Sequence, residues 1–301
     1  MPSPHISREQ LRALQVSPAL YRWFVRRFPQ GGSYQAVHAA MINEGQNAWL
    51  ESLVNYAYAQ HFGTAAFVQQ ELGCAQAMAT ALTPVPAEQL HIAPRLTGRF
   101  TPLAACTLQF ATGDHALNIG CSGFHSNLAS TGNGNIIGQS GDNGSIASAG
   151  YGCQLLSSGV GAKVGNTGQN SRISCSGDHA RIGNTGNAVK ISSAGRGTHI
   201  ASSGRRNYLI SQGEATHVTN AGEGCHIHTL GAGTHIANSG DNVTLQVNGD
   251  DSVICSTGSV SHFTLGKGGC AALTYHDGTR LRFVTLYEGE NGIQAGITSL
   301  Q

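Results

Sequence analysis

The sequence is poor in charged and aromatic residues and has no long apolar segment. Only 11% of its 301 residues are charged and 6% are aromatic. No window approaches the roughly 18 apolar residues of a membrane-spanning helix, and the first residues lack the apolar core of a secretory signal. The formal net charge of +1 argues against a nonspecific nucleic-acid binder. These absences favour a cytoplasmic protein that neither enters membranes nor binds nucleic acid.

Motifs for catalysis, metal binding and disulfides are also missing. No Gly-x-Ser-x-Gly elbow, phosphate loop or readable pair of carboxylates occurs, so we expect no enzymatic activity. The eight cysteines are scattered, without the spacing of a disulfide framework or a C-x-x-C zinc pair. This pattern indicates buried thiols in a reducing compartment.

Glycine, by contrast, is abundant and recurs every nine residues. The chain has 41 glycines. One stands at each of positions 123, 132, 141, 150, 159, 168, 177, 186, 195, 204, 213, 222, 231, 240, 249 and 258. Five residues after each glycine comes an aliphatic or aromatic residue, in a series that runs from Leu128 to Phe263. Because the glycine series and the aliphatic or aromatic series keep the same spacing through so many copies, they establish a nine-residue repeat.

Each repeat predicts one short strand and one turn. The positions three, five and seven after the glycine form one face of an extended strand. The side chain is small at the first of these positions, large and apolar at the second, and mostly polar at the third. A unit of this size cannot bury its apolar face alone, so the copies are expected to stack into a parallel β-solenoid of the β-helix or β-roll kind. Inward Ser and Asn would then form hydrogen-bonded ladders. We expect two repeats per coil, with three as the alternative.

The turns are expected where the repeat glycine is followed by Asp or Asn, as in Gly141-Asp142-Asn143. These residues adopt positive φ at little cost. Calcium-binding β-rolls need a column of aspartates, and here Asp is sporadic. The repeat therefore predicts a fold that needs no calcium.

The chain is expected to have three parts: an α-helical domain at 1–100, the solenoid at 101–265 and a β-hairpin cap at 266–301. A proline-containing linker is expected between about 82 and 100. The fragment Gly113–Ile119 resembles a repeat but stands ten residues before Gly123, which predicts an insertion.

Serines mark the helix starts in the first part. Ser17 precedes Pro18, and Ser33 precedes a second apolar-periodic stretch, so both are expected to cap helices. The helical domain would cap the solenoid and hide the open edge of its first coil. Alternatively, it would bind a partner through a basic face formed by Arg22, Arg26 and Arg27.

The residue four positions after the glycine is outward and is mostly basic or histidine from residue 163 onward. With two repeats per coil, His199, His217 and His235 stack on one face, and Lys163 and Arg181 continue the line. Arg172, Lys190, His226 and His262 would lie on the other face. The candidate site residues are therefore Lys163, Arg172, Arg181 and Lys190 for an anion or partner, and His199, His217 and His235 for a metal.

Three functions fit such a column of side chains. Adjacent imidazoles could share a transition-metal ion, they could form a surface that gains charge below about pH 6, or the column could bind an anionic polymer. A column of long polar side chains can also serve solubility alone.

The repeat resembles that of uncharacterised bacterial and prophage-encoded proteins. The similarity lies in units such as Gly177–Thr185 and Gly231–Ser239, and in the closing segment Tyr287–Ile293 with its Y-x-G-E-N-G-I pattern. It covers roughly residues 113–297 and is only loose in the helical beginning. The resemblance implies a β-solenoid and no known activity, and the prophage association points to phage–host biology.

The sequence therefore predicts a mainly β protein with a parallel β-solenoid and an N-terminal helical domain. We expect a non-enzymatic scaffold or binding module that presents a regular face to a macromolecular partner, most simply a protein. The alternative is a metal- or pH-responsive protein that uses the histidine ladder. No cofactor is expected unless that ladder holds a transition metal. Self-association through the solenoid ends or the helical domain is a further expectation.

Overall fold

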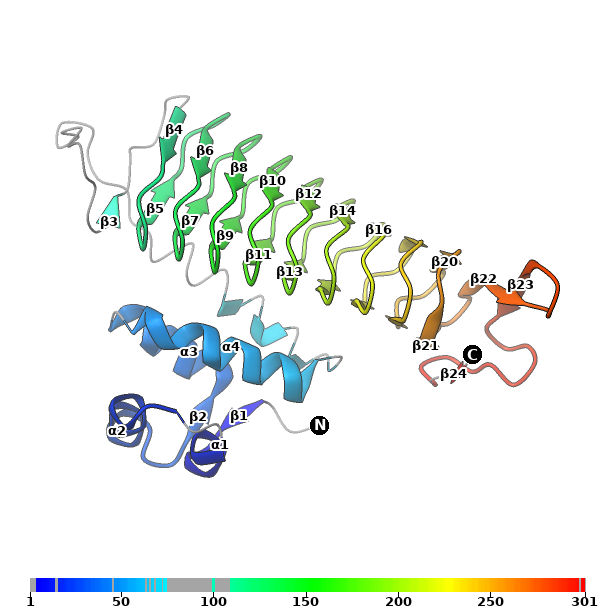
Figure 1. Ribbon diagram of the computed structural model, residues 1–301, viewed down its shortest axis with the longest axis horizontal. Helices are drawn as coiled ribbons and strands as arrows, with labels where there is room; N and C mark the ends of the chain where they lie inside the picture. Colours follow the sequence, from blue (N-terminus) through cyan, green and yellow to red (C-terminus); the bar gives the residue numbers. More distant parts are fainter. Residues whose placement is uncertain are drawn as a thin grey trace. The chain divides into compact units, whose positions relative to one another are not determined.

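The computed structural model describes residues 4–13, 16–44, 46–62, 64, 66–67, 69–71, 73–74, 99–100, 109–297 and 299–300. The chain divides into two compact units, Met1–Ala81 and Leu82–Gln301 (Figure 1). The first is helical and the second is a β-solenoid. The expected linker between about 82 and 100 lies outside the described residues, except for a two-residue strand at its end.

In the described residues of the helical unit, helices surround a two-stranded sheet of short strands. They are β1 (His5–Ile6), α1 (Arg8–Ala13), α2 (Pro18–Arg27), β2 (Gly32–Ser33), α3 (Tyr34–Asn43) and α4 (Asn47–His61), and residues 66–67, 69–71 and 73–74 are also helical. Both predicted caps are confirmed, because Ser17 Oγ accepts from Leu20 N and Ser33 Oγ accepts from Ala36 N, each at 3.2 Å. In the described part of the chain, no helix is long and apolar enough to cross a membrane.

A buried carboxylate stands at the centre of this unit. Glu71 is fully buried and accepts hydrogen bonds from Tyr34 Oη at 2.8 Å and Tyr58 Oη at 2.9 Å. Phe67 packs against both tyrosine rings, 5.5 Å and 5.0 Å away between centroids. Hydrogen bonds to both carboxyl oxygens offset the cost of removing this polar group from water.

The second unit is built almost wholly from strands of four residues, which Figure 1 shows as a row of coils coloured from green to orange. The strands are β3 (Arg99–Phe100), β4 (Gln109–Thr112), β5 (Asn118–Cys121), β6 (Asn127–Ser130), β7 (Ile136–Gln139), β8 (Ser145–Ser148), β9 (Gln154–Ser157), β10 (Lys163–Asn166), β11 (Arg172–Cys175), β12 (Arg181–Asn184), β13 (Lys190–Ser193), β14 (His199–Ser202), β15 (Tyr208–Ser211), β16 (His217–Asn220), β17 (His226–Thr229), β18 (His235–Asn238), β19 (Val243–Val247), β20 (Val253–Ser256), β21 (Val260–Thr264), β22 (Cys270–His276), β23 (Leu281–Tyr287) and β24 (Ser299–Leu300).

These strands form two eleven-stranded sheets. One, here called the even sheet, contains the even-numbered strands from β4 to β22 and ends in β23. The other, the odd sheet, contains the odd-numbered strands from β3 to β21 and ends in β24. Val164 pairs with Ile182 and Ile173 with Ile191, 18 residues apart and parallel. Two repeats therefore make one coil, as predicted, and the solenoid fold is confirmed.

The interior matches the predicted ladders. Every plus-five residue from Leu128 to Phe263 is at most 3% exposed, and each such side chain contributes about 1.5–3 kcal/mol by leaving water. The polar interior column is hydrogen-bonded from coil to coil: Asn166 Nδ2 donates to Asn184 Oδ1 at 2.9 Å, and Asn220 Nδ2 to Asn238 Oδ1 at 2.8 Å. These bonds satisfy amides that would otherwise destabilise a narrow core.

The turn predicted at Gly141-Asp142-Asn143 is confirmed, but the glycine itself does not adopt positive φ. Positive φ occurs two residues later, at Asn143 (56°), Gly161 (67°) and their equivalents. A Cβ at Gly177 would instead lie 2.0 Å from the carbonyl oxygen of Gly159, one coil earlier, and the same collision recurs along the column. Glycine is required there because stacked coils approach too closely for any side chain.

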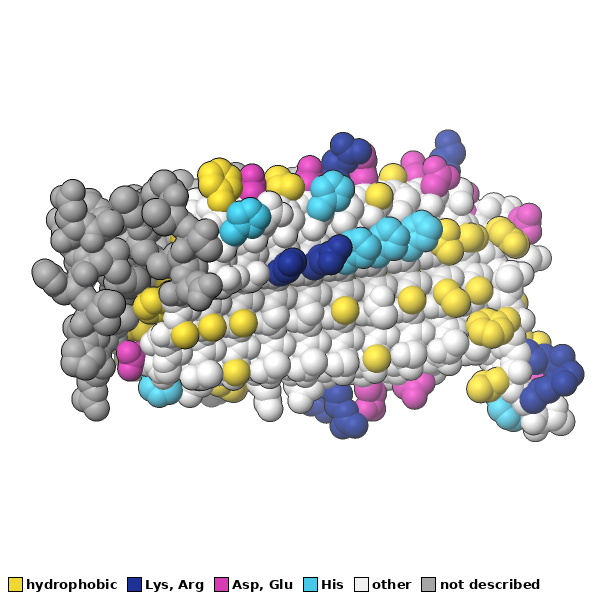
Figure 2. Space-filling view, turned by 90° about the horizontal axis from the view of Figure 1, so that it is seen from above, with side chains coloured by type: hydrophobic (Ala, Val, Ile, Leu, Met, Phe, Trp, Pro, Cys, Tyr) yellow, Lys and Arg dark blue, Asp and Glu magenta, His cyan; other side chains and the backbone are white. Residues whose placement is uncertain are grey.

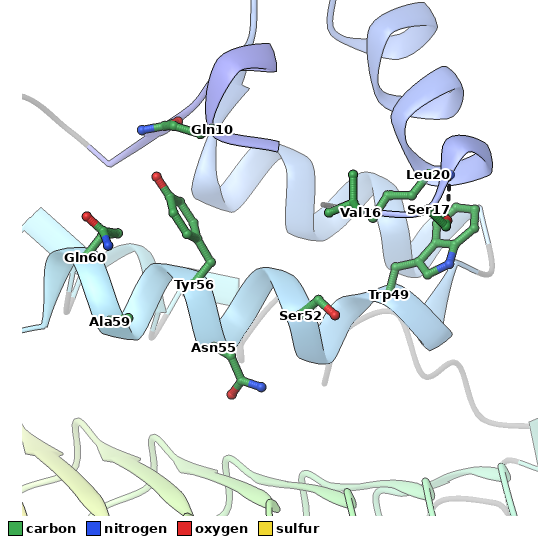
Figure 3. A pocket seen from close by; sticks show the side chains of 10 residues that line it. All are labelled: Gln10, Val16, Ser17, Leu20, Trp49, Ser52, Asn55, Tyr56, Ala59 and Gln60. Carbon is green, nitrogen blue, oxygen red and sulfur yellow. Dashed lines mark hydrogen bonds between the residues drawn. The ribbon is translucent and has the colours of Figure 1, made fainter. Parts of the chain in front are cut away.

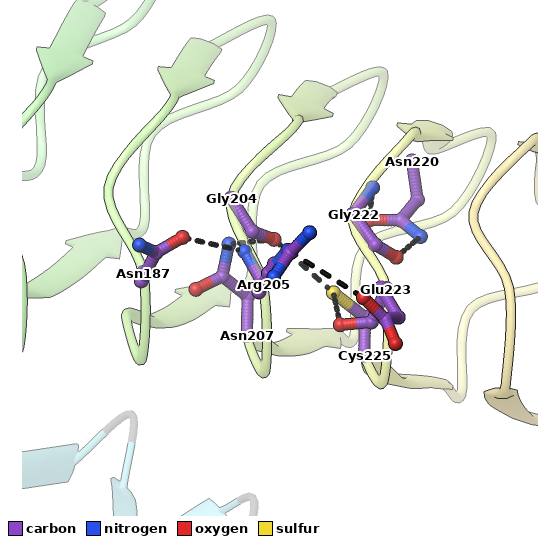
Figure 4. Close-up of polar contacts among 8 residues, drawn as sticks. All are labelled: Asn187, Gly204, Arg205, Asn207, Asn220, Gly222, Glu223 and Cys225. Atoms are coloured by element: carbon purple, nitrogen blue, oxygen red, sulfur yellow. Dashed lines mark hydrogen bonds and ion pairs between the residues drawn. The ribbon is translucent and has the colours of Figure 1, made fainter.

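The residue after the glycine links neighbouring turns. Asp142 Oδ1 accepts from Val160 N, and Asp178 Oδ1 accepts from Arg196 N, both at 2.8 Å. Asn187 Oδ1 accepts from Arg205 N in the same way, at the opposite edge (Figure 4). The sporadic aspartates thus hydrogen-bond the backbone of the next coil, which explains why Asp and Asn interchange there.

The solenoid continues beyond the glycine series at its start. Ile119 pairs with Ile137, 18 residues on, and Ala116 has the φ of 56° that marks the turn. A Cβ at Gly132 would meet the carbonyl oxygen of Asp114, so Asp114 occupies the glycine position. The predicted insertion is therefore wrong, because the nine-residue register runs through unbroken.

The predicted hairpin closes the even sheet. Strands β22 and β23 pair antiparallel from Cys270↔Tyr287 to His276↔Leu281. Strand β24 pairs antiparallel with β21 at the corresponding end of the odd sheet. Val284 and Leu286 of β23 pack against the end of the interior. Antiparallel strands thus end both parallel stacks.

Candidate functional site

The outer face of the even sheet consists of three exposed columns. On β10, Lys163 and Gly165 are exposed while Val164 and Asn166 are buried, and the neighbouring strands repeat this alternation. We call the first column the ridge: Lys163, Arg181, His199, His217 and His235. We call the other two columns the track: Gly165, Gly183, Ala201, Thr219, Ala237 and Cys255 in one, and Thr167, Thr185, Ser203, Ala221, Ser239 and Thr257 in the other.

The ridge is straight and regular. Figure 2 shows two cationic side chains followed by three histidines in one line, as the two-repeat coil predicts. The ring centroids of His199 and His217 are 4.8 Å apart with planes 7° from parallel, and those of His217 and His235 are 5.1 Å apart at 16°. The imidazoles are stacked, so their nitrogens lie at the ring edges along the exposed ridge. They can donate or accept hydrogen bonds at regular intervals.

No acidic residue neutralises this face. All residues of the ridge and track lie in the described range, and none is Asp or Glu. Neither Lys163 nor Arg181 forms an ion pair with any described residue. Arginines in the turns differ, because each pairs with a glutamate one coil on: Arg196 with Glu214 at 3.4 Å, and Arg205 with Glu223 at 3.5 Å (Figure 4). The ridge thus presents positive charge that the fold leaves unpaired.

The histidines extend this positive charge when they take up protons. The pKa of His199 lies below its ordinary value, first because partial burial penalises the imidazolium and then because of nearby His217, Arg181 and His179. An anion placed against the ridge would reverse the electrostatic part of this effect. The charge of the ridge therefore rises in acid and with anion binding.

Metal binding at the histidines would need a rearrangement. The ligating lone pairs lie in the ring planes, and nearly parallel stacked rings direct them side by side. Throughout the described ranges, no group of three or more His, Cys, Asp or Glu could hold a metal ion. In this geometry the ladder favours protons and anions.

Two of the predicted site residues lie elsewhere. Arg172 and Lys190 pair with each other in the odd sheet and are only 5% and 9% exposed. Their predicted role in binding an anion or a partner therefore stays a prediction, at side chains that are less exposed than those of the ridge. The repeat places this position outward in both sheets, but it does not determine which outer face remains accessible. The odd sheet continues with the stacked rings of Tyr208 and His226, 4.9 Å apart.

The track was not predicted, although the sequence contains its signal. Six residues after the glycine, alternate repeats have Gly, Ala, Thr or Cys, and these are the residues of the even sheet. The repeats between them include Leu156, Ile210 and His228, all in the odd sheet. This alternation at an outward position distinguishes the two faces, whereas the inward positions are alike.

A second candidate is a cavity of about 920 Å³ in the helical unit (Figure 3). Its walls come from the region of α1, the start of α2 and helix α4, with Leu20, Trp49 and Tyr56 as the large side chains. Burial raises the pKa of Tyr56, against a hydrogen bond from Gln10. The described residues that line it are uncharged.

The basic face predicted on α2 is partly neutralised. Glu44 pairs with Arg27 at 3.0 Å and accepts from Trp23 Nε1 at 2.6 Å. Arg22 Nε donates to the carbonyl oxygen of Pro18 at 3.2 Å. Arg22 and Arg26 are exposed and form no ion pair with a described residue, so this face still presents positive charge.

Comparison with known proteins connects the helical unit to an uncharacterised family. Residues 1–62 match a family model described as the YdhT N-terminal domain. The chain is 43% identical over 75 residues to the uncharacterised protein YdhT of Escherichia coli (strain K12), which is 25% of this chain and 28% of that protein. The chain thus spans less than a third of this relative, and no solved structure matches it. The matching family model covers the helical beginning, where the sequence suggested only loose similarity.

Proposed function

We propose that the chain is a non-enzymatic binding module whose even-sheet face contacts a macromolecular partner along several coils. The observation that carries this proposal is the ridge, an exposed line of two cationic and three imidazole side chains, with no acidic residue in the ridge or the track. Unpaired charge of one sign favours association with the opposite charge. The prophage-like repeats support a role in phage–host biology.

The track supports the same proposal. Small side chains beside the ridge leave the surface flat, so a partner can approach the backbone over many coils. A surface that served solubility alone would gain from mixed charges, as in the ion-paired turns. The even-sheet face combines unpaired charge with easy access.

The test is affinity capture from bacterial lysate, with proteins, nucleic acids and carbohydrates all identified in the bound fraction. The tagged full chain is compared with Lys163→Gln/Arg181→Gln, and with Arg196→Gln/Arg205→Gln as a control that removes the same charge from the turns. We expect a macromolecule that the wild type and control retain and the ridge variant loses. Equal recovery by all three proteins, or no recovery of any macromolecule, would contradict the proposal.

The second candidate is a protein that responds to protons through the stacked imidazoles, or to a metal ion that rearranges them. Under it, zinc or a shift to pH 5.5 would change the melting temperature of the wild type, and His199→Gln/His217→Gln/His235→Gln would abolish the change. If zinc, EDTA and acid each change the melting temperature of neither the wild type nor the triple histidine variant, this candidate is eliminated.

A further inference from the structure

We infer that the even-sheet face binds an acidic polysaccharide whose chain runs along the solenoid axis. This inference rests on the proposed function and specifies its partner. Three features carry it: the interval of the ridge, the open track beside it, and the side chains that the face lacks.

The ridge repeats once per coil, with ring centroids 4.8 Å and 5.1 Å apart. A hexuronate carries one carboxylate, and one sugar of an extended chain is about as long as this interval. If successive carboxylates face the same side of the sugar chain, one meets the ridge at every coil. If they alternate between two sides, one meets the ridge at every second coil. An extended peptide offers carboxylates on one side about every 6.6 Å, and a DNA strand rises about 3.4 Å per phosphate. The charges of an extended peptide or a DNA strand would therefore fall out of step with the ridge side chains within a few coils.

The track is open enough for a sugar chain. A Cβ at Gly165 or Gly183 would meet no atom within 4 Å, so the backbone there is accessible from outside. The outer column of the track supplies hydroxyl groups at Thr167, Thr185 and Ser203, all exposed. From ridge to hydroxyl column the strand advances about 13 Å. A single polysaccharide chain can lie in this width, with carboxylates toward the ridge and hydroxyls toward Ser and Thr.

The missing side chains disfavour other anionic polymers. Between β6 and β20 the three columns, all described, contain no Phe, Tyr or Trp. Single-stranded nucleic acids bind by stacking their bases on such residues. Protein partners dock through large buried anchors, and the track offers only Gly, Ala, Ser, Thr and Cys. An acidic helix could follow the ridge at about 5.4 Å per turn, but it would find no apolar groove here.

The first experiment measures binding of the full chain to polygalacturonate and polymannuronate at pH 5.5 and 7.5, in low and high salt. Amylose, poly-glutamate and single-stranded DNA serve as comparison polymers. We expect at least tenfold tighter binding of a polyuronate than of any comparison polymer. Affinity should rise at pH 5.5 as His199, which faces His217, Arg181 and His179, takes up a proton. It should fall in high salt, which screens the charges.

Variants then locate the binding. Lys163→Gln/Arg181→Gln should weaken polyuronate binding at least tenfold, while Arg196→Gln/Arg205→Gln should change it less than twofold. Gly165→Gln/Gly183→Gln fills the track at positions with open space, so it should weaken binding without lowering the melting temperature.

The outcomes separate the two proposals. If poly-glutamate or DNA binds more tightly and the ridge variant loses it, the face is a binding site and the polysaccharide inference is wrong. If a polyuronate binds equally to the wild type, the ridge variant and the track variant, it binds elsewhere and the inference is also wrong. If no macromolecule depends on the ridge, both proposals fall together.

Discussion

The even and odd sheets of the solenoid share one interior and differ on their outer faces. Inside, both follow the same ladder, as the register pairs Val164↔Ile182 and Ile173↔Ile191 show. Outside, the even sheet has a cationic ridge beside small residues, whereas the odd sheet includes Leu156 and Ile210 at the corresponding positions. Packing and hydrogen bonding constrain the inward positions equally. The outward positions differ in burial as well, because Leu156 and Ile210 of the odd sheet are 2% and 0% exposed, whereas the track residues of the even sheet are exposed.

The largest predicted effect separates inward from outward glycines. Gly177→Ala forces a Cβ against the Gly159 carbonyl and should lower the free energy of unfolding by about 3 kcal/mol. Gly183→Ala, on the same coil in the track, meets open space and should change it by less than about 1 kcal/mol, toward higher stability. Urea denaturation of the two variants tests this. Equal losses would show that coil stacking is not what requires the glycine.

A smaller effect separates the histidines of the two sheets in acid. Burial lowers the pKa of His228 in the odd sheet to about 4. The unfolded chain takes up this proton near pH 6.5 and the folded chain only near pH 4, so stability falls as pH drops through this window. The loss from His228 should reach roughly 2–3 kcal/mol by pH 4.

Urea denaturation at pH 7, 6, 5 and 4 measures that loss. His228→Gln should flatten the pH dependence. His199→Gln, on the exposed ridge, should flatten it much less. A wild-type slope retained in His228→Gln would contradict the assignment.

The smallest effect is on the stability of the ridge variant. Lys163 and Arg181 are exposed and form no ion pair with described residues, so Lys163→Gln/Arg181→Gln should shift the free energy of unfolding by less than about 0.5 kcal/mol. Thermal and urea melts measure this shift beside the binding assays. A decrease in the free energy of unfolding of more than about 1.5 kcal/mol would mean that Lys163 and Arg181 stabilise the fold, which would contradict a role in binding alone.

Much of the solenoid could be predicted because its physics repeats. The glycine and plus-five registers predicted the strands, and together with the expected coil of two repeats they predicted the line from Lys163 to His235. The sequence could not show that Arg172 and Lys190 are buried, since both sheets place the same repeat position outward. The repeat that begins at Asp114 was missed because Asp114 stands where the other repeats have glycine.

The two-residue strands β1 and β2 have no pattern long enough to detect. The small residues of the track were present in the sequence, but their alternation acquires meaning only once the strands are assigned to two sheets. Local turns and caps such as those at Ser17 and Ser33 were predictable because a single side chain makes them.

The most direct test of the even-sheet face uses Cys255, an exposed thiol in the track one coil beyond His235. Its alkylation rate is followed by mass spectrometry, with and without saturating polygalacturonate at pH 5.5, and half-buried Cys270 is followed in the same digest. We predict that the polymer slows alkylation of Cys255 at least fivefold in the wild type and much less in Lys163→Gln/Arg181→Gln. An unchanged rate at Cys255 while the polymer is bound would contradict the account, because the ligand would then occupy another surface.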